Sequence, residues 1–312
     1  MQKKRYRTFN EQLRERFGGK IVKISLDAGF TCPNRDGTLG IGGCVYCSER
    51  GSGDYAGDQR LSIPDQFIAV KERMKNKWPS AQYIAYFQAH TNTYAAVKRL
   101  REVYEEALAE ENVVGLSIST RPDCLPEDVL DYLEELNRRT YLWVELGLQS
   151  IHSKTMEWIG RGHDYAQFLK GLEQLQARGI RVCAHIILGL PGETKAEMVE
   201  TAQAVAQLPL QGIKIHLLHV LRGTPLATIY QNVPFDLLTK EEYVSLVVDI
   251  LEILPPEVVI HRLTGDGPPD DLLGPLWSRK KWEVLNAIDA ELERRDSWQG
   301  KFAKQASIKC RR

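Results

Sequence analysis

The chain has 312 residues, 43% of them hydrophobic, and its 41 basic side chains balance 41 acidic ones. This length suits one large domain with an appendage, or two domains. No apolar run reaches transmembrane length and the first 17 residues lack the apolar core of a secretion signal, so we expect a cytoplasmic protein without a membrane partner.

The two ends of the chain are strongly basic. Residues 1–23 contain eight Lys or Arg against two acids, and residues 277–312 contain ten against five. Basic ends that flank an acidic middle favour an anionic partner, with RNA or DNA as the usual candidates. Solvated, frayed ends are the alternative interpretation. We take residues 1–20 as a basic amino-terminal arm.

Short apolar runs alternate with amphipathic patterns along the middle of the chain. The apolar runs are typical of buried parallel strands and cover residues 21–26, 82–87, 113–119, 141–147, 181–188 and 212–220. The amphipathic patterns predict helices over residues 94–110, 126–139, 164–179 and 194–208. Thr194, followed three residues later by Glu197, predicts a capping box. The repeated strand–helix order predicts an α/β fold, either a parallel barrel or a partial barrel.

A different pattern begins after the sixth strand. Residues 257–263 predict a seventh strand, and a Gly/Pro-rich link over residues 265–275 leads to a polar helix over residues 277–295. We therefore divide the chain into a core over residues 21–263 and a carboxyl-terminal helical extension over residues 264–312.

Three cysteines directly after the first strand are the strongest chemical signal. Cys32, Cys44 and Cys47 have the spacing C-x11-C-x2-C, and no fourth cysteine lies close in sequence. In a reducing compartment, clustered cysteines indicate metal ligands or catalysts rather than disulfides. Three thiolates can hold an iron–sulfur cluster with one iron left open, whereas structural zinc and electron-transfer clusters normally have four protein ligands. The remaining cysteines lack ligand spacing: Cys124, Cys183 and Cys310.

Polar side chains also follow the other predicted strands, where a parallel barrel places its site. Gln88 follows the second strand, and Glu145 and Gln149 alternate with leucines along the fourth. Inward-facing polar groups in a barrel are costly unless they bind something, although a structural hydrogen-bond network is the alternative. The turn at Gly189–Gly192 has exposed backbone groups that suit a flat ring, and Arg161 lies in a glycine-flanked turn.

Taken together, these motifs resemble those of the radical S-adenosylmethionine (SAM) enzymes. The motifs CPNRDGT, GGCVYC, STRPD, ELGLQS and RGHDY occur in this order, and the resemblance spans about residues 5–300. The wide cysteine spacing is similar to that of the branch that includes the catalytic subunit of elongator, and within it to the bacterial YhcC/YtqA subgroup. The resemblance implies a partial (β/α)6 barrel with a carboxyl-terminal extension.

The resemblance also implies specific ligands. Cys32, Cys44 and Cys47 would bind three irons of a [4Fe-4S] cluster, and SAM would chelate the fourth iron. The implied SAM contacts are Tyr46 and the turn from Gly189 to Gly192 at the adenine, Glu145, Gln149 and Arg161 at the ribose and carboxylate, and Gln88 where the superfamily often has a Gly-Gly-Glu motif that this chain lacks.

The implied activity is reductive cleavage of SAM to a 5′-deoxyadenosyl radical, with electrons from a partner such as flavodoxin or ferredoxin. The subgroup resemblance points to tRNA, in which a wobble uridine would be converted from a 5-carboxymethylaminomethyl to a 5-aminomethyl side chain. The basic ends would then contact phosphates while interleaved aromatic residues stack on bases. These aromatic residues are Tyr6, Phe9, Phe17, Trp277, Trp282 and Trp298.

Two other functions compete with this one. A radical SAM enzyme with a small-molecule or porphyrin-like substrate would keep the same cofactors. A non-catalytic nucleic-acid-binding protein would instead hold a structural zinc with the three cysteines and a histidine, either His90 or His216.

Overall fold

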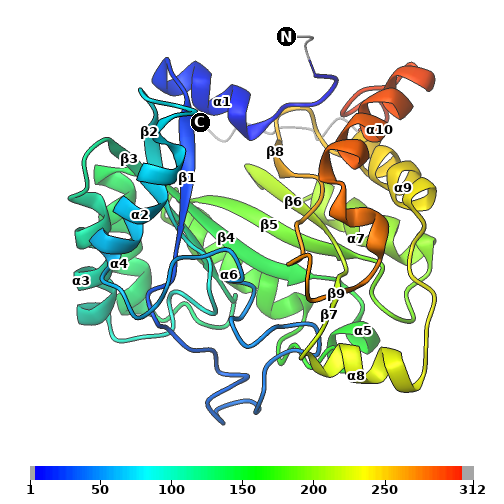
Figure 1. Ribbon diagram of the computed structural model, residues 1–312, viewed down its shortest axis with the longest axis horizontal. Coiled ribbons are helices and arrows are strands. Elements are labelled where there is room, and N and C mark those ends of the chain that lie inside the picture. Colours follow the sequence, from blue (N-terminus) through cyan, green and yellow to red (C-terminus); the bar gives the residue numbers. More distant parts are fainter. Residues whose placement is uncertain (1–3, 304–312) are drawn as a thin grey trace.

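The computed structural model describes residues 4–303 and contains one large parallel sheet that curls into a half-barrel (Figure 1). Its strand order is β1-β2-β3-β4-β5-β6-β8, and every neighbouring pair is parallel. The strands are β1 (Ile21–Leu26), β2 (Gln82–Phe87), β3 (Val113–Thr120), β4 (Tyr141–Gln149), β5 (Arg181–Leu188), β6 (Gly212–Leu217) and β8 (Val259–Arg262). The predicted α/β partial barrel is confirmed, and the seventh predicted strand forms its edge beside β6.

Helices cover the outer face of the sheet, where amphipathic segments bury their apolar sides (Figure 1). The principal helices are α2 (Ile63–Lys75), α3 (Val97–Leu108), α4 (Glu127–Arg139), α6 (Tyr165–Ala177), α7 (Lys195–Ala206), α9 (Lys240–Ile253) and α10 (Lys281–Arg294). Shorter helices are α5 (Ser153–Trp158), α8 (Pro225–Asn232) and the 3-10 turn η1 (Leu276–Arg279). The predicted capping box at Thr194 and Glu197 is present at the start of α7.

The sequence analysis did not predict α9, although Thr239 and Glu242 form a capping box at its start. This helix packs against both α7 and α10, so apolar side chains occur all around it rather than on one stripe. Its buried residues include Tyr243, Val247 and Leu251.

The helix α1 (Phe9–Phe17) closes the amino-terminal end of the half-barrel, opposite the loop that follows β1 (Figure 1). Phe9 stacks on His261 at a ring distance of 3.9 Å and meets Trp143 edge-on at 5.6 Å. Tyr6 and Phe9 are both buried. This corrects our expectation that these two rings stack on nucleic-acid bases, because their faces already contact the protein.

A small antiparallel ribbon joins the carboxyl-terminal segment to the mouth of the barrel. It pairs β7 (Val220–Leu221) with β9 (Leu272–Gly274). The predicted sixth strand over residues 212–220 was too long, because the chain leaves the main sheet after Leu217 and Val220 belongs to the ribbon. Among the described residues, no helix is long and apolar enough to cross a membrane.

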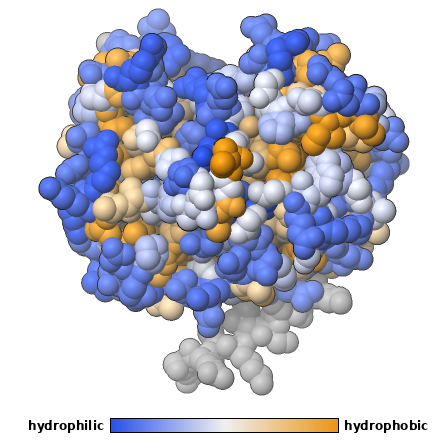
Figure 2. All heavy atoms as spheres, turned by 90° about the horizontal axis from the view of Figure 1, so that it is seen from below, coloured by the Kyte–Doolittle hydropathy of each residue, from blue (hydrophilic) through white to orange (hydrophobic). Residues whose placement is uncertain are grey.

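The connection from β1 to α2, residues 27–62, lies across the carboxyl ends of the strands at the bottom of Figure 1. Figure 2 views the molecule from this side and shows a mainly hydrophilic face with apolar residues gathered near its centre. The three predicted metal-binding cysteines belong to this connection, which we call the cysteine loop.

Candidate active site at the mouth of the barrel

A cavity at the carboxyl ends of the strands brings together eight of the ten residues that the sequence singled out. These are Cys32, Cys44, Tyr46, Cys47, Gln88, Glu145, Gln149 and Arg161. Gly189 and Gly192 do not line the cavity, and both have left-handed backbone angles. A Cβ atom at Gly189 would lie 3.3 Å from Leu238 and 3.9 Å from Leu218, and Leu218 lines the cavity.

The cysteine loop is held in place by hydrogen bonds around the buried Cys44. The Asn34 side-chain amide lies 3.4 Å from the Cys44 sulfur and also donates to the carbonyls of Gly160 and Arg161, at 2.8 and 3.0 Å. Arg161 Nη1 lies 3.8 Å from the same sulfur. A hydrogen bond from Cys47 and the positive charge of Arg161 hold the pKa of Cys44 well below its usual range. Cys44 is therefore favoured as a thiolate, the form that binds metal.

Arg161 is buried between the cysteine loop and β4. Its Nη2 donates to the Gly147 carbonyl at 3.3 Å, whereas its Nε has no hydrogen-bond partner. A buried guanidinium donor without a partner is costly unless an acceptor occupies the cavity. An anionic ligand beside Arg161 would supply that acceptor.

The end of β4 is shaped to bring Arg161 and Gln149 close to the backbone. A Cβ atom at Gly147 would lie 2.5 Å from Arg161 Nη2 and 2.9 Å from Gln149 Nε2. Gln149 has φ of 77°, and the register between β4 and β5 shifts at this point. A left-handed non-glycine residue costs about 1–3 kcal/mol, and such residues concentrate at functional sites. The strain turns the Gln149 side chain into the cavity.

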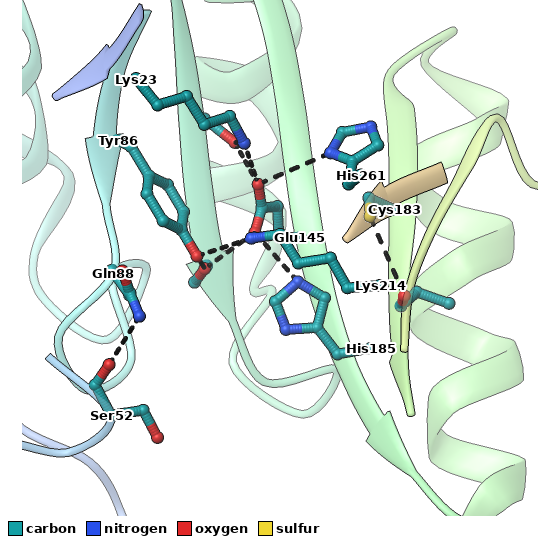
Figure 3. A network of polar contacts seen from close by, with 12 residues as sticks. Lys23, Ser52, Tyr86, Gln88, Glu145, Cys183, His185, Lys214 and His261 are labelled. Atoms are coloured by element: carbon teal, nitrogen blue, oxygen red, sulfur yellow. Dashed lines mark hydrogen bonds and ion pairs between the residues drawn. The ribbon is translucent and has the colours of Figure 1, made fainter. Parts of the chain in front are cut away.

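Gln88 and Tyr46 both line the cavity. Gln88 Nε2 donates to the Ser52 carbonyl at 2.7 Å, so it ties the end of β2 to the cysteine loop (Figure 3). Tyr46 lies between two of the loop cysteines and packs partly against the apolar cluster that contains Met156.

Deeper in the half-barrel, Glu145 is the centre of a charged network (Figure 3). One carboxylate oxygen accepts hydrogen bonds from Lys23 Nζ at 2.5 Å and Ser117 Oγ at 2.6 Å. The other accepts from Lys214 and from His185 Nε2, the latter at 2.9 Å. The carboxylate is thus fully surrounded by donors from β1, β3, β5 and β6, and we call this group the Glu145 network.

The charges in the Glu145 network follow from burial and proximity. Burial opposes ionisation of Glu145, but Lys214 and Lys23 outweigh it and hold the pKa of this carboxyl well below its usual range. Burial lowers the pKa of His185 to about 4, so the imidazole is neutral at pH 7. A carboxylate can only accept, so neutral His185 must carry its proton on Nε2. Burial lowers the pKa of both Lys23 and Lys214, and their pairing with Glu145 opposes that shift.

The sequence analysis missed Lys23 and Lys214, although a signal was present. Each lysine interrupts an apolar strand, in IVKISL and in GIKIHLL. Lysine is almost never fully buried unless it is paired, so a lysine inside a predicted barrel strand implies an acidic partner across the sheet. Glu145 was that partner.

Protonation of the buried histidines should make the protein less stable in mild acid. His185 and His219 have pKa values lowered to about 4, burial being the main cause in each case. Between this value and about 6.5 the unfolded chain binds more protons than the folded one, so stability falls as pH falls. From about pH 7 to about pH 5 we expect a loss of about 2 kcal/mol for each histidine.

Urea unfolding at the two pH values measures this loss. His185→Gln removes one titrating group and should lessen the loss by about 2 kcal/mol. A free energy of unfolding that stays constant or rises on acidification would contradict the assignment of neutral buried histidines.

The histidines do not complete a tetrahedral site with the cysteines. Within residues 4–303, no three His, Cys, Asp or Glu side chains converge closely enough to hold a single metal ion. His90 lines the cavity with its Nδ1 unpartnered, and His216 lies on β6 across the cavity.

The other cysteines lie away from the cavity. Cys183 is buried among Phe9, Trp143 and Val259 near the closed end of the half-barrel. Cys124 is buried beside Asp123, outside the wall of the cavity. Cys310 lies outside the described residues.

Comparison with protein families gives two adjacent matches. The model described as the radical SAM superfamily matches residues 32–205, and the model described as the radical SAM carboxyl-terminal domain matches residues 210–294. The first match begins at Cys32, the first cysteine of the cysteine loop, and ends within α7. Together the two matches cover the sheet from β2 to β8, the ribbon and α10, and β1 lies before the first match.

Two bacterial relatives are similar over nearly their whole length. Protein YtqA of Bacillus subtilis is 57% identical over 299 residues, which are 96% of this chain and 93% of that protein. Protein YhcC of Escherichia coli is 40% identical over 285 residues, which are 91% of each chain.

More distant similarity extends to larger proteins. The tRNA uridine(34) acetyltransferase of Methanocaldococcus jannaschii is 28% identical over 163 residues, which are 51% of this chain but only 30% of that protein. The solved structure of archaeal Methanocaldococcus infernus Elp3 superposes with a TM-score of 0.68 at 18% identity, covering 89% of this chain and 64% of that one. The structural likeness supports the fold.

Proposed function

The chain belongs to the radical SAM superfamily of enzymes, and we propose that it uses a [4Fe-4S] cluster and SAM to modify the wobble uridine of tRNA. The observation that supports this most directly is the cavity that combines three cysteines with a buried, incompletely satisfied Arg161. The reaction that we propose converts a 5-carboxymethylaminomethyl group to a 5-aminomethyl group.

The donor set at the cysteine loop fits a cluster. Cys32, Cys44 and Cys47 offer three thiols at one wall of the cavity, which leaves one iron of a [4Fe-4S] cluster for a ligand from solution. Asn34 and Arg161 direct N–H groups at the Cys44 sulfur. Hydrogen bonds to the sulfurs are one means by which a protein adjusts the reduction potential of such a cluster.

The neighbouring wall fits SAM. The unpartnered Nε of Arg161 would donate to the SAM carboxylate, and the planar guanidinium suits a two-pronged contact that lysine cannot make. Gln149 is turned toward the same space by its left-handed backbone. Tyr46 would pack near the adenine, and the turn at Gly189–Gly192 would support that wall from behind. Both oxygens of Glu145 already accept hydrogen bonds from protein side chains, so Glu145 would support the SAM site through the Glu145 network rather than by direct contact with SAM.

When bound, the cluster and SAM supply a 5′-deoxyadenosyl radical after electron transfer from a partner such as flavodoxin or ferredoxin. The chain's own residues orient the reactants and exclude water. The half-barrel encloses the cavity on the strand side, and the cysteine loop, tied to β2 through Gln88 and Ser52, covers the carboxyl ends. The deeper Glu145 network fixes β1, β3, β5 and β6 relative to one another, so the walls keep their spacing.

Enlarging Gly147 tests the proposed SAM contacts. In Gly147→Ala the new methyl group would overlap Arg161 Nη2 and Gln149 Nε2, so both side chains must move. We expect the dissociation constant for SAM to rise about 10- to 100-fold, the effect of losing a charged hydrogen bond. Equilibrium dialysis of the cluster-loaded protein measures it.

Gly19→Ala is the matched control, because nothing lies within 4 Å of its added Cβ. Unchanged SAM affinity in Gly147→Ala, with the cluster intact, would remove Arg161 and Gln149 from the proposed SAM site.

Two observations support tRNA as the substrate. A relative that shares half of this chain carries the name tRNA uridine(34) acetyltransferase. The cysteine loop also presents the exposed residues Ile41, Arg50 and Tyr55, a basic and apolar combination that suits an unstacked base and its phosphates. Among the aromatic residues near the ends of the chain, Trp282 and Trp298 remain exposed. Because α1 and the far end of α10 lie opposite the cysteine loop in Figure 1, we place the anticodon at the mouth instead.

Mass spectrometry of tRNA nucleosides tests the proposed function. Cells that lack the gene should accumulate 5-carboxymethylaminomethyluridine derivatives at the wobble position and lose the 5-aminomethyl forms. Reintroducing the wild-type gene should restore the 5-aminomethyl forms, whereas a gene that encodes Cys44→Ala should not. If the nucleosides are identical in all these strains, the tRNA assignment is wrong, and a small-molecule or porphyrin-like substrate becomes the next candidate.

A further inference from the structure

The wall of the cavity that faces the cysteine loop is formed by β6, β8 and the segment after β8. Its polar residues are His216, His219, Arg262 and Asp266. None of these residues belongs to the proposed cluster or SAM contacts. This wall therefore faces the space that remains for a substrate.

Arg262 carries a positive charge without a partner. Among residues 4–303 it forms no hydrogen bond and no ion pair, although it lies at the rim of the half-barrel and lines the cavity. It pairs in register with Lys214, so a second cation lies beside it on the neighbouring strand. Glu145, which lies deeper, is already shared by Lys214 and Lys23. Among the described residues, the Arg262 guanidinium therefore faces the cavity without an ion-pair partner.

Two neutral imidazoles accompany Arg262. His216 and His219 each have a buried Nε2 without a hydrogen-bond partner. Burial lowers the pKa of both, to about 4 for His219, so neither adds a charge at pH 7. A Cβ atom at Gly265 would approach both rings at 3.7 Å, and the absence of a side chain there leaves the space beside them open. The rings can each offer a hydrogen bond to a ligand that enters this space.

We propose that Arg262, His216 and His219 form an anion subsite that binds the carboxylate of the wobble-uridine side chain. This inference rests on the proposed function, since it assigns the carboxymethyl end of the substrate to a particular wall. The guanidinium provides a two-pronged contact to the carboxylate, and the imidazoles hydrogen-bond to its oxygens or to the neighbouring amine. Bound in this way, the methylene between nitrogen and carboxylate faces back toward the cysteine loop.

The acidic residues nearby do not make this wall a cation site. Asp266 forms an ion pair with Lys281, so its charge is met by the protein. Both oxygens of Glu145 accept hydrogen bonds from protein donors. A cationic ligand at this wall would instead meet the guanidinium of Arg262.

Removing the negative charge from the substrate side chain tests this inference. The two probes are anticodon stem-loops with a single modified wobble uridine, one carrying the 5-carboxymethylaminomethyl group and the other its uncharged carboxamide. The measured quantities are kcat and KM for product formation, together with 5′-deoxyadenosine release. Reconstituted wild-type enzyme should prefer the carboxylate by about 10- to 100-fold in kcat/KM.

In Arg262→Gln this preference should disappear mainly through a higher KM for the carboxylate, with a much smaller rise in KM for the carboxamide. Arg262→Lys keeps the positive charge but lacks the planar guanidinium that makes a two-pronged contact, so this variant should retain part of the preference. Arg222→Gln, at an exposed arginine beside the ribbon, is the matched control and should behave as the wild type.

The outcomes separate the inference from the proposed function. If wild type prefers the carboxylate and Arg262→Gln keeps that preference, the subsite is wrong and the tRNA reaction stands. If the variant loses activity equally on both probes, Arg262 has a structural role and the inference fails. If wild-type enzyme converts neither stem-loop, the proposed function fails and this assignment of the ligand fails with it.

Discussion

Replacing Cys44 with alanine should abolish SAM cleavage, because the cluster would keep only two of its three protein ligands. Cys44 is the most buried of the three loop cysteines and the one whose sulfur receives hydrogen bonds from Asn34 and Arg161. We expect purified, anaerobically reconstituted Cys44→Ala to bind less iron and sulfide, to lack the brown colour of the wild type, and to release 5′-deoxyadenosine only at the level of a sample without protein.

Cys183→Ala is the matched control for this experiment. Cys183 is as deeply buried but lies among Phe9, Trp143 and Val259, away from the cavity. Its variant should keep the iron content, the colour and the SAM cleavage of the wild type. Full iron content and SAM cleavage in Cys44→Ala would contradict the proposed ligand set, and a colourless wild-type protein with stoichiometric zinc would favour the zinc alternative.

The second large effect concerns stability. Glu145→Gln removes the single carboxylate that neutralises Lys23 and Lys214 inside the half-barrel. Removing one partner of a buried ion pair typically costs about 3–5 kcal/mol, because the remaining charge is left without compensation. We expect a loss of this size in the free energy of unfolding, measured by urea denaturation at pH 7.

A double-mutant cycle identifies the cause of that loss. Lys214→Met removes one of the two ammonium groups, and Glu145 then still pairs with Lys23 and His185. If the unpaired charge is responsible, the double variant Glu145→Gln/Lys214→Met should be more stable than the sum of the two single losses predicts. Additive losses would mean that the network is held mainly by packing.

The sequence predicted the architecture well where each strand is buried on both faces. The bounds of β1, β2 and β5 agree with the apolar runs, since continuous burial leaves a clear signal. The prediction was poorer where tertiary contacts override local pattern. The strand predicted over residues 212–220 is divided because Val220 pairs with Gly274 in the ribbon, a contact of distant residues that no local pattern contains.

The candidate site shows the same division. The cysteine spacing and the strand-end motifs singled out eight residues that line one cavity. Gly189 and Gly192 were singled out with them because a glycine-rich turn resembles a ligand-binding turn, and they are not among the residues that line the cavity. Arg262 received no attention, since an arginine near the end of a strand is unremarkable until its neighbours are known.

The sequence by itself determined the fold class, the order of the strands' polar ends and the thiol set of the cysteine loop, because these depend on residue type and spacing along the chain. Only the tertiary structure decided that Glu145 is enclosed by Lys23 and Lys214 and that Tyr6 and Phe9 are buried. It also decided that Arg262 faces the cavity with no ion-pair partner for its side chain among residues 4–303. The physical reason is that charge compensation and burial depend on which distant segments meet, and strand pairing brings those segments together.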